Sequence, residues 1–210
     1  MIYNALTTPQ LIYIIVVSII VVLVILLILL FPVRKYQIKK RFHDYYYKEI
    51  FRIVKYNDYY LINNFSFRVD DSSLLTIDHI VFADKYVYLI NDFYIDGDVA
   101  GKIFDKSLIK LNRDGNKQYF DNPALKSKFL LTRLCMVTGL DPNIMIGVSL
   151  VNDNCKSEIV SDSKQFYIVS RGKLAQLIKA VESRPIGKLN AKSLESLVKS
   201  INKMNKRKKK

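Results

Sequence analysis

The stretch LLTIDHIVFADKYVYLI, residues 74–90, decides the fold of this chain. Two runs rich in β-branched and aromatic residues, 74–82 and 86–90, are separated by Ala83, Asp84 and Lys85. Runs of this composition and length are typical of strands, and a short polar connection between them is typical of a hairpin. The stretch therefore predicts two adjacent strands, and residues 59–67 predict a strand before them.

The segments on either side of this hairpin predict the rest of an α/β domain. Residues 39–55 show helical spacing of apolar side chains. Asn122 and Pro123 are typical of a helix start, and Gly139 is typical of a helix end. Further strands are expected at 102–111 (one or two), 144–151 and 165–169, and further helices at 173–181 and 191–204. This order predicts a mixed sheet flanked by helices.

The N-terminal region has a different composition. No residue before Arg34 is charged, and residues 11–33 are almost entirely Ile, Val and Leu. As a helix these residues would extend about 34 Å, enough to cross a hydrocarbon core of about 30 Å. They predict an uncleaved transmembrane helix rather than a signal peptide, which would begin with basic residues. Because basic residues follow it, we expect residues 1–10 outside the cell and a cytoplasmic C-terminal domain on a single-pass protein of the cell membrane.

The formal net charge of +14 lies mostly in two end segments. The segment 34–41 is expected to contact anionic lipid, and the tail is expected either to bind DNA or RNA through phosphates or only to solubilise the C-terminus. The predicted membrane-surface residues are Arg34, Lys35, Lys39, Lys40 and Arg41, and the predicted nucleic-acid-binding residues of the tail are Lys206, Arg207, Lys208, Lys209 and Lys210. The predicted boundaries are therefore 1–10, 11–33, 34–41, 42–204 for the domain, and 205–210 for the tail.

Several short strings, in order, resemble the NERD (nuclease-related domain) family, whose fold is restriction-endonuclease-like. They are IDHIV at 77–81, YVYLIN at 86–91, Gly101, NPALK at 122–126 and QFYIVS at 165–170. The resemblance covers about 44–204. It implies a metal-dependent nuclease site with an Asp on the second strand, and a Glu followed two residues later by a Lys on the third.

The residues at those positions keep only part of that site. Asp78 matches the Asp and is the candidate metal ligand, but the Glu position falls on Asn91 and the Lys position on Phe93. Asn is a poor ligand for a hard cation, so Asp78, Asn91 and Phe93 resemble a vestigial site. Lys126 takes the place of a Gln of the family and is a further candidate for nucleic-acid binding.

Other carboxylates offer an alternative. A shift by one residue puts Asp92 at the acid position and Tyr94 at the Lys position, which turns that pair to the other face of the sheet. Asp96 and Asp98 follow, in a segment typical of a turn. At the start of the first helix, where the family has another Glu, Asp44 is the acid present among 44–47.

These observations predict a membrane-anchored, cytoplasmic NERD-like domain that is catalytically inactive and serves as a binding or scaffolding module. Its expected partners are membrane lipid, DNA or RNA bound nonspecifically, and an unidentified protein. With Cys135, Cys155 and two histidines at no metal-binding spacing, no cofactor is expected. The alternative is an active nuclease that uses Mg²⁺, Asp78 and a displaced carboxylate. A third interpretation is a structural membrane protein whose domain binds another protein.

Overall fold

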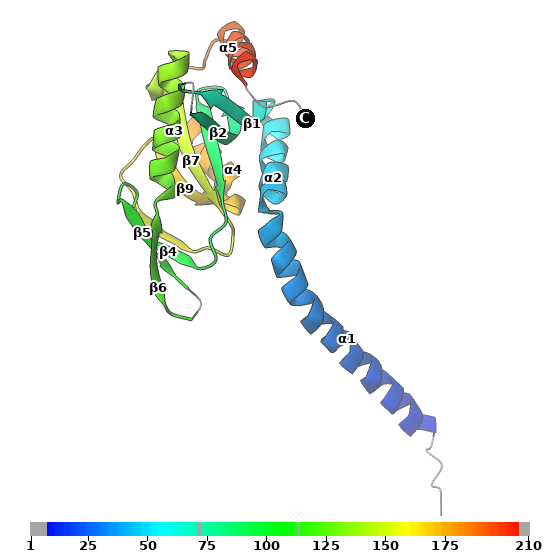
Figure 1. The fold of residues 1–210 in the computed structure, drawn as a ribbon. Helices are drawn as coiled ribbons and strands as arrows, with labels where there is room; N and C mark the ends of the chain where they lie inside the picture. Colours follow the sequence, from blue (N-terminus) through cyan, green and yellow to red (C-terminus); the bar gives the residue numbers. More distant parts are fainter. Residues whose placement is uncertain (1–7, 71–72, 113, 206–210) are drawn as a thin grey trace, which may run out of the picture. The chain divides into compact units, whose positions relative to one another are not determined.

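The computed structural model describes residues 8–70, 73–112 and 114–205 of the chain (Figure 1). Contacts within the chain divide it into two units, Met1–Phe42 and His43–Lys210. Across the described residues it contains two mixed sheets and five α-helices.

The first unit contains one long helix, α1 (Thr8–Lys40). Among the described residues, no helix combines the length and the apolar character needed to cross a membrane. The predicted transmembrane helix at 11–33 is therefore wrong, and so are the single-pass topology and membrane location that depended on it.

The second unit is built on a five-stranded sheet in the order β1-β2-β3-β7-β9. Its first three strands are antiparallel and form the predicted meander, closed at the hairpin by the Ala83 N–H, which donates to the carbonyl of Tyr86 over 3.0 Å. The last three strands run parallel. The bounds are β1 (Tyr60–Arg68), β2 (Leu74–Phe82), β3 (Val87–Phe93), β7 (Met145–Val151) and β9 (Phe166–Ser170).

A second sheet has four short strands in the order β6-β5-β4-β8. The strands β4 (Asp98–Lys102) and β5 (Ser107–Leu111) confirm the prediction of short strands within 102–111 only in part, because β4 begins earlier. The edge strands β6 (Lys117–Asp121) and β8 (Ser157–Val160) were not predicted. Both are largely exposed, so neither carries the alternation of buried and exposed residues that marks a strand in a sequence.

The helices follow the sequence signals closely. They are α2 (Phe42–Asn57), α3 (Pro123–Thr138), α4 (Leu174–Glu182) and α5 (Ala191–Met204), with short 3₁₀ turns at Pro142–Ile144 and Arg171–Lys173. The side chain of Asn122 accepts a hydrogen bond from the N–H of Ala124 over 2.9 Å, and Gly139 ends α3 with a φ of 71°. The predicted start and end of α3 are thus confirmed.

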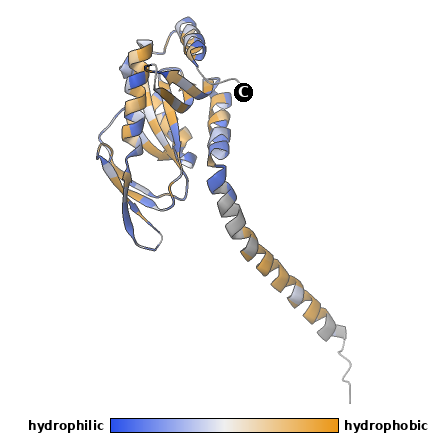
Figure 2. Cartoon of the chain, viewed as in Figure 1, coloured by the Kyte–Doolittle hydropathy of each residue, from blue (hydrophilic) through white to orange (hydrophobic). Residues whose placement is uncertain are grey.

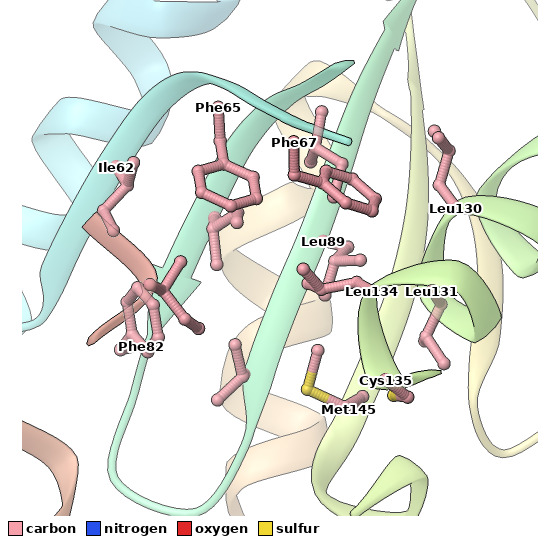
Figure 3. Packing of buried hydrophobic residues seen from close by; sticks show 14 of the residues in the cluster. Ile62, Phe65, Phe67, Phe82, Leu89, Leu130, Leu131, Leu134, Cys135 and Met145 are labelled. Atoms are coloured by element: carbon pink, nitrogen blue, oxygen red, sulfur yellow. The ribbon is translucent and has the colours of Figure 1, made fainter. Parts of the chain in front are cut away.

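Helices pack on both faces of the first sheet. On one face Leu89 of β3 lies in a cluster with Leu130 and Leu134 of α3 (Figure 3). On the other face the hydroxyl of Tyr88 reaches Glu182 of α4. The central strands between these layers are mostly hydrophobic (Figure 2). Because side chains alternate along a strand, Asn91 shares the face of Leu89, whereas Asp92 shares the face of Tyr88.

Candidate metal centre

Three side chains from three elements meet where the pairing of β2 with β3 ends. They are His43 at the start of α2, Asp78 in β2 and Asp92 near the end of β3. Each offers a ligand atom, and these atoms all lie within 4.8 Å of one another. With Asp44, Tyr47, Asn63, Asn64 and His79 they line a pocket of about 240 Å³.

The strands bring the two carboxylates together because their pairing stops at this point. The ladder between β2 and β3 ends with His79 opposite Ile90. Beyond it, Oδ2 of Asp78 accepts a hydrogen bond from the backbone N–H of Asp92 over 2.9 Å. Across the site in β1, Asn64 has a φ of 50°, a left-handed conformation that asparagine tolerates better than most residues. The backbone near Asp78 and Asp92 therefore departs from regular strand pairing.

The carboxylate of Asp92 is at the centre of the cluster, and its side chain has no exposed surface. Its Oδ2 atom lies 2.9 Å from Nδ1 of His43 and 3.1 Å from Nε2 of His79. Within the described part of the chain, its buried Oδ1 atom has no hydrogen-bond partner. Burying a carboxylate is costly unless its oxygens are hydrogen-bonded or coordinate a cation, so Oδ1 has the character of an open ligand position.

His79 holds Asp92 in place. Its side chain is 6 % exposed, its ring stacks on that of Tyr47, and its Nδ1 lies 2.7 Å from Oδ1 of Asn63. A neutral imidazole has one N–H. In the tautomer with its proton on Nε2, His79 donates to the carboxylate of Asp92, and an Asn63 amide turned to present its NH₂ donates to Nδ1.

Tyr46 fixes the end of β3 from the same side. Its hydroxyl donates to the carbonyl of Phe93 over 3.0 Å. Burial raises the pKa of Tyr46, and the nearby charge of Asp92 raises it further. The phenol thus stays a neutral hydrogen-bond donor beside Asp92.

The donor set fits a divalent metal ion. Carboxylates are ligands that suit Mn²⁺, and an imidazole suits Zn²⁺ or Fe²⁺. A site with two carboxylates and one imidazole therefore suits any of these three ions. The side chain of His43 is 55 % exposed, which leaves its ring room to turn a nitrogen toward an ion. His43, Asp78 and Asp92 are therefore a candidate metal-binding cluster.

No protein-family model and no curated protein matches this chain. Among solved structures, it is similar to the crystal structure of AF1548, a protein of unknown function. The two chains are 10 % identical, the similarity covers 74 % of this chain and 78 % of that chain, and the TM-score is 0.36. Similarity at this level supports no argument about fold or function, and the resemblance to the NERD family stays a prediction.

Two of the three residues predicted as a vestigial site lie away from the cluster. Asn91 is buried on the α3 face, where its Nδ2 donates to Oγ of Ser127 over 3.3 Å. Phe93 is on that face too, with Nζ of the exposed Lys126 lying 5.3 Å from its ring centroid. Asp78 alone joins the pocket, because the alternation of side chains turns Asn91 and Phe93 away from it.

Of the alternative acids, Asp92 and Asp44 line the pocket, whereas Asp96 and Asp98 do not. Asp98 begins β4, where its Oδ1 accepts from the N–H of Lys156 over 3.0 Å; Asp96 precedes it in the same connection. The tail 206–210 and the side chains of Arg34 and Lys35 lie outside the described residues. Lys39, Lys40 and Arg41 are exposed, and their contact with anionic lipid stays a prediction.

His43 is the functional candidate that the sequence interpretation missed. The family resemblance directed attention to acids at 44–47, and His43 is one residue before that window. Its signal was its place at the start of the first helix of the domain. Extending that window by one residue and accepting any ligand type would have included it.

Proposed function

We propose that the unit His43–Lys210 binds one divalent metal ion through His43, Asp78 and Asp92 and acts as a metal-dependent nuclease. The observation that carries this proposal is the buried carboxylate of Asp92, whose Oδ1 atom has no hydrogen-bond partner among the described residues. A structural carboxylate in such a place would have both oxygens paired. A carboxylate that serves as a ligand needs one oxygen open.

Asp92 supports the nuclease alternative over the inactive module. The family resemblance requires a second acid on the third strand, and Asn91 cannot supply it. Asp92 is one residue later, and it reaches Asp78 because the pairing of β2 with β3 ends before them. The nucleic-acid substrate rests on the resemblance alone, since the pocket itself does not distinguish one phosphodiester from another.

The chain's own groups have separable roles in this proposal. A bound divalent ion supplies Lewis-acid stabilisation of the phosphate and a more acidic water. His79 orients the carboxylate of Asp92 through Nε2, and Asn63 orients His79. Asp44 is exposed and lines the same pocket, so we assign it the role of accepting the proton of the attacking water.

One observation favours a second candidate function. Among the described residues that line the pocket, none is Lys or Arg, whereas the resemblance implies a lysine near the metal. A domain that binds a metal ion and nucleic acid without cutting would need no such cation.

A cleavage assay separates the two. The full chain is incubated with single- and double-stranded DNA and RNA in Mn²⁺ or Mg²⁺, alongside Asp92→Asn, Asp78→Asn and, as a matched control, Asp121→Asn. Asp121 is exposed at the end of β6 and does not line the pocket.

We expect metal-dependent cleavage by the wild type and by Asp121→Asn. Losing one metal-ligand carboxylate should reduce the rate at least about 100-fold, since ligands contribute several kcal/mol of charge stabilisation. A wild type that binds Mn²⁺ but cuts none of the substrates would establish the non-catalytic module. Cleavage that survives Asp92→Asn would show that the site is elsewhere.

A further inference from the structure

A second cavity lies between α2 and α4 and shares no lining residue with the metal pocket. Its volume of about 510 Å³ is within the roughly 300–1,000 Å³ of small-molecule sites. The buried side chains of Ile53 and Ile178 face it from the two helices, with Ala175 and Tyr56 beside them. The cavity therefore offers an apolar slot of ligand size away from the proposed chemistry.

Hydrogen bonds hold both walls of this cavity in place. At the end of α2 the N–H of Tyr59 donates to the carbonyl of Val54 over 3.0 Å, and Nδ2 of Asn57 donates to the carbonyl of Ile53 over 2.8 Å. At the end of α4 the carboxylate of Glu182 accepts from the hydroxyl of Tyr88 over 2.7 Å and from the N–H of Lys85 over 2.9 Å. A slot with fixed walls keeps its shape without a ligand, which lowers the entropic cost of binding.

The charged groups around the slot are mostly positive. Arg52 of α2 and Lys179 of α4 line it from facing helices, and both are exposed. Nη2 of Arg52 donates to Glu49 over 2.6 Å. The other N–H groups of its guanidinium can donate to a ligand. Lys179 has no ion-pair partner among the residues that the structure describes. The acid that lines the slot, Glu182, is half-buried and already accepts two hydrogen bonds.

We propose that this slot binds a small amphipathic anion, with its apolar body between Ile53 and Ile178 and its acidic group beside Arg52 and Lys179. A cationic ligand would meet both of these side chains at the rim. It would gain little from Glu182, because burial raises the pKa of that carboxyl and so disfavours its charged form. The apolar walls and the two facing cations are complementary to an aromatic or aliphatic carboxylate or sulfonate.

The test uses two fluorescent probes with the same rings. Anilinonaphthalene sulfonate is an apolar anion, and phenylnaphthylamine is its uncharged counterpart. Both are titrated into the full chain, into Ala175→Trp, which fills the slot from an exposed helix position, and into Lys179→Glu, which reverses one rim charge. Lys192→Glu, on the exposed face of α5, is the matched control, and thermal unfolding checks that each variant is folded.

We expect one sulfonate probe per chain, bound at least about fivefold more tightly than the neutral probe, since a single charge-assisted contact contributes about 1 kcal/mol or more. Ala175→Trp should abolish binding of both probes. Lys179→Glu should weaken the sulfonate about five- to tenfold and leave the neutral probe unchanged, and Lys192→Glu should change neither. Equal affinity for both probes, or folded Ala175→Trp protein that still binds the sulfonate, would overturn the proposal.

Discussion

At the end of β3, two neighbouring residues face opposite sides of the sheet, and this difference decides the candidate site. Asn91 points to α3 and bonds to Ser127, while Asp92 points to the pocket and lies against His43 and His79. An acid at position 92 can serve as a metal ligand. An acid at position 91 would be a charge buried against α3.

This contrast gives a direct prediction for Asn91→Glu, the change that restores the acid at the position implied by the family resemblance. The new carboxylate would lie where Asn91 is now 1 % exposed, without a cation nearby, so we expect a loss of about 3 kcal/mol or more in the free energy of unfolding. It should add no affinity for Mn²⁺. Urea unfolding measures the first effect and a Mn²⁺ titration the second.

Asn91→Gln is the control for size, since it adds the same methylene without a charge. If Asn91→Glu were as stable as Asn91→Gln and bound Mn²⁺ more tightly than the wild type, the assignment of Asn91 to the α3 face would be contradicted.

Cys155 gives a prediction about pH. Burial raises the pKa of its thiol to about 11, and the charge of Asp98 contributes. The unfolded chain loses this proton near pH 9 and the folded chain only near pH 11, so the folded state binds more protons in between. The stabilisation is complete below about pH 9 and disappears as the pH rises through about 11.

Two measurements check the thiol. Native protein at pH 8 should react slowly with a disulfide reagent such as Ellman's and quickly in urea, because the thiolate is the nucleophile. The decline in unfolding free energy between pH 9 and 11 should be smaller in Cys155→Ala. Rapid labelling of Cys155 in the folded protein would show that its thiol is neither buried nor raised in pKa.

At the scale of elements, the predictable parts were those with a strong local signal. The hairpin at 74–90, the capped helix α3 and the apolar strand β7 each carry such a signal, and each is present. The strands β6 and β8 carry none, because both are largely exposed edge strands. In addition, β8 pairs with β4, which is distant in sequence, so its existence depends on tertiary pairing that a local pattern does not contain.

The side chain of Asn122 caps α3 and also bonds to the segment between β4 and β5. Its removal should therefore lower the free energy of unfolding by more than the loss of a helix cap alone. Besides capping α3, its Nδ2 donates to the carbonyls of Ile103 and Asp105 over 3.0 and 2.7 Å. We expect Asn122→Ala to lower the free energy of unfolding by about 2–4 kcal/mol, the sum of a cap and of carbonyls left without their donor. Urea unfolding measures it.

Asn190→Ala is the matched control. Asn190 caps α5 by accepting from the N–H groups of Lys192 and Ser193, and it is exposed. Its loss should cost about 1 kcal/mol. Equal costs at the two positions would show that the bonds of Asn122 to Ile103 and Asp105 contribute nothing.

At the scale of the whole molecule, composition predicted a mixed α/β domain after residue 41, and the second unit begins at His43. The predicted transmembrane helix was wrong, since no helix among the described residues has the length and apolar character to cross a membrane. Of the candidate metal cluster, Asp78 was a predicted ligand and Asp92 an alternative acid, but His43 was missed, because the convergence of these side chains depends on where a strand ladder ends. That endpoint is a property of the assembled sheet.

The division into units predicts that residues 42–205 fold without α1. Among the described residues, the two core clusters around Leu89 and Val99 contain none from α1, so the excised fragment should unfold in one cooperative thermal transition. Its midpoint should lie within a few degrees of the transition that the full chain shows for this unit. A fragment that melts without cooperativity would place part of the domain's core in the first 41 residues.

The claim that Asp92 is a metal ligand is tested most directly by equilibrium binding of Mn²⁺, measured by electron paramagnetic resonance on the full chain. Bound Mn²⁺ loses the sharp signal of the free ion, so the count does not depend on catalysis. We predict one ion per wild-type chain and per Asp121→Asn chain, and an affinity at least about tenfold weaker in folded Asp92→Asn, since each tenfold step corresponds to about 1.4 kcal/mol. Equal binding by the wild type and Asp92→Asn, or no binding by either, would contradict the account.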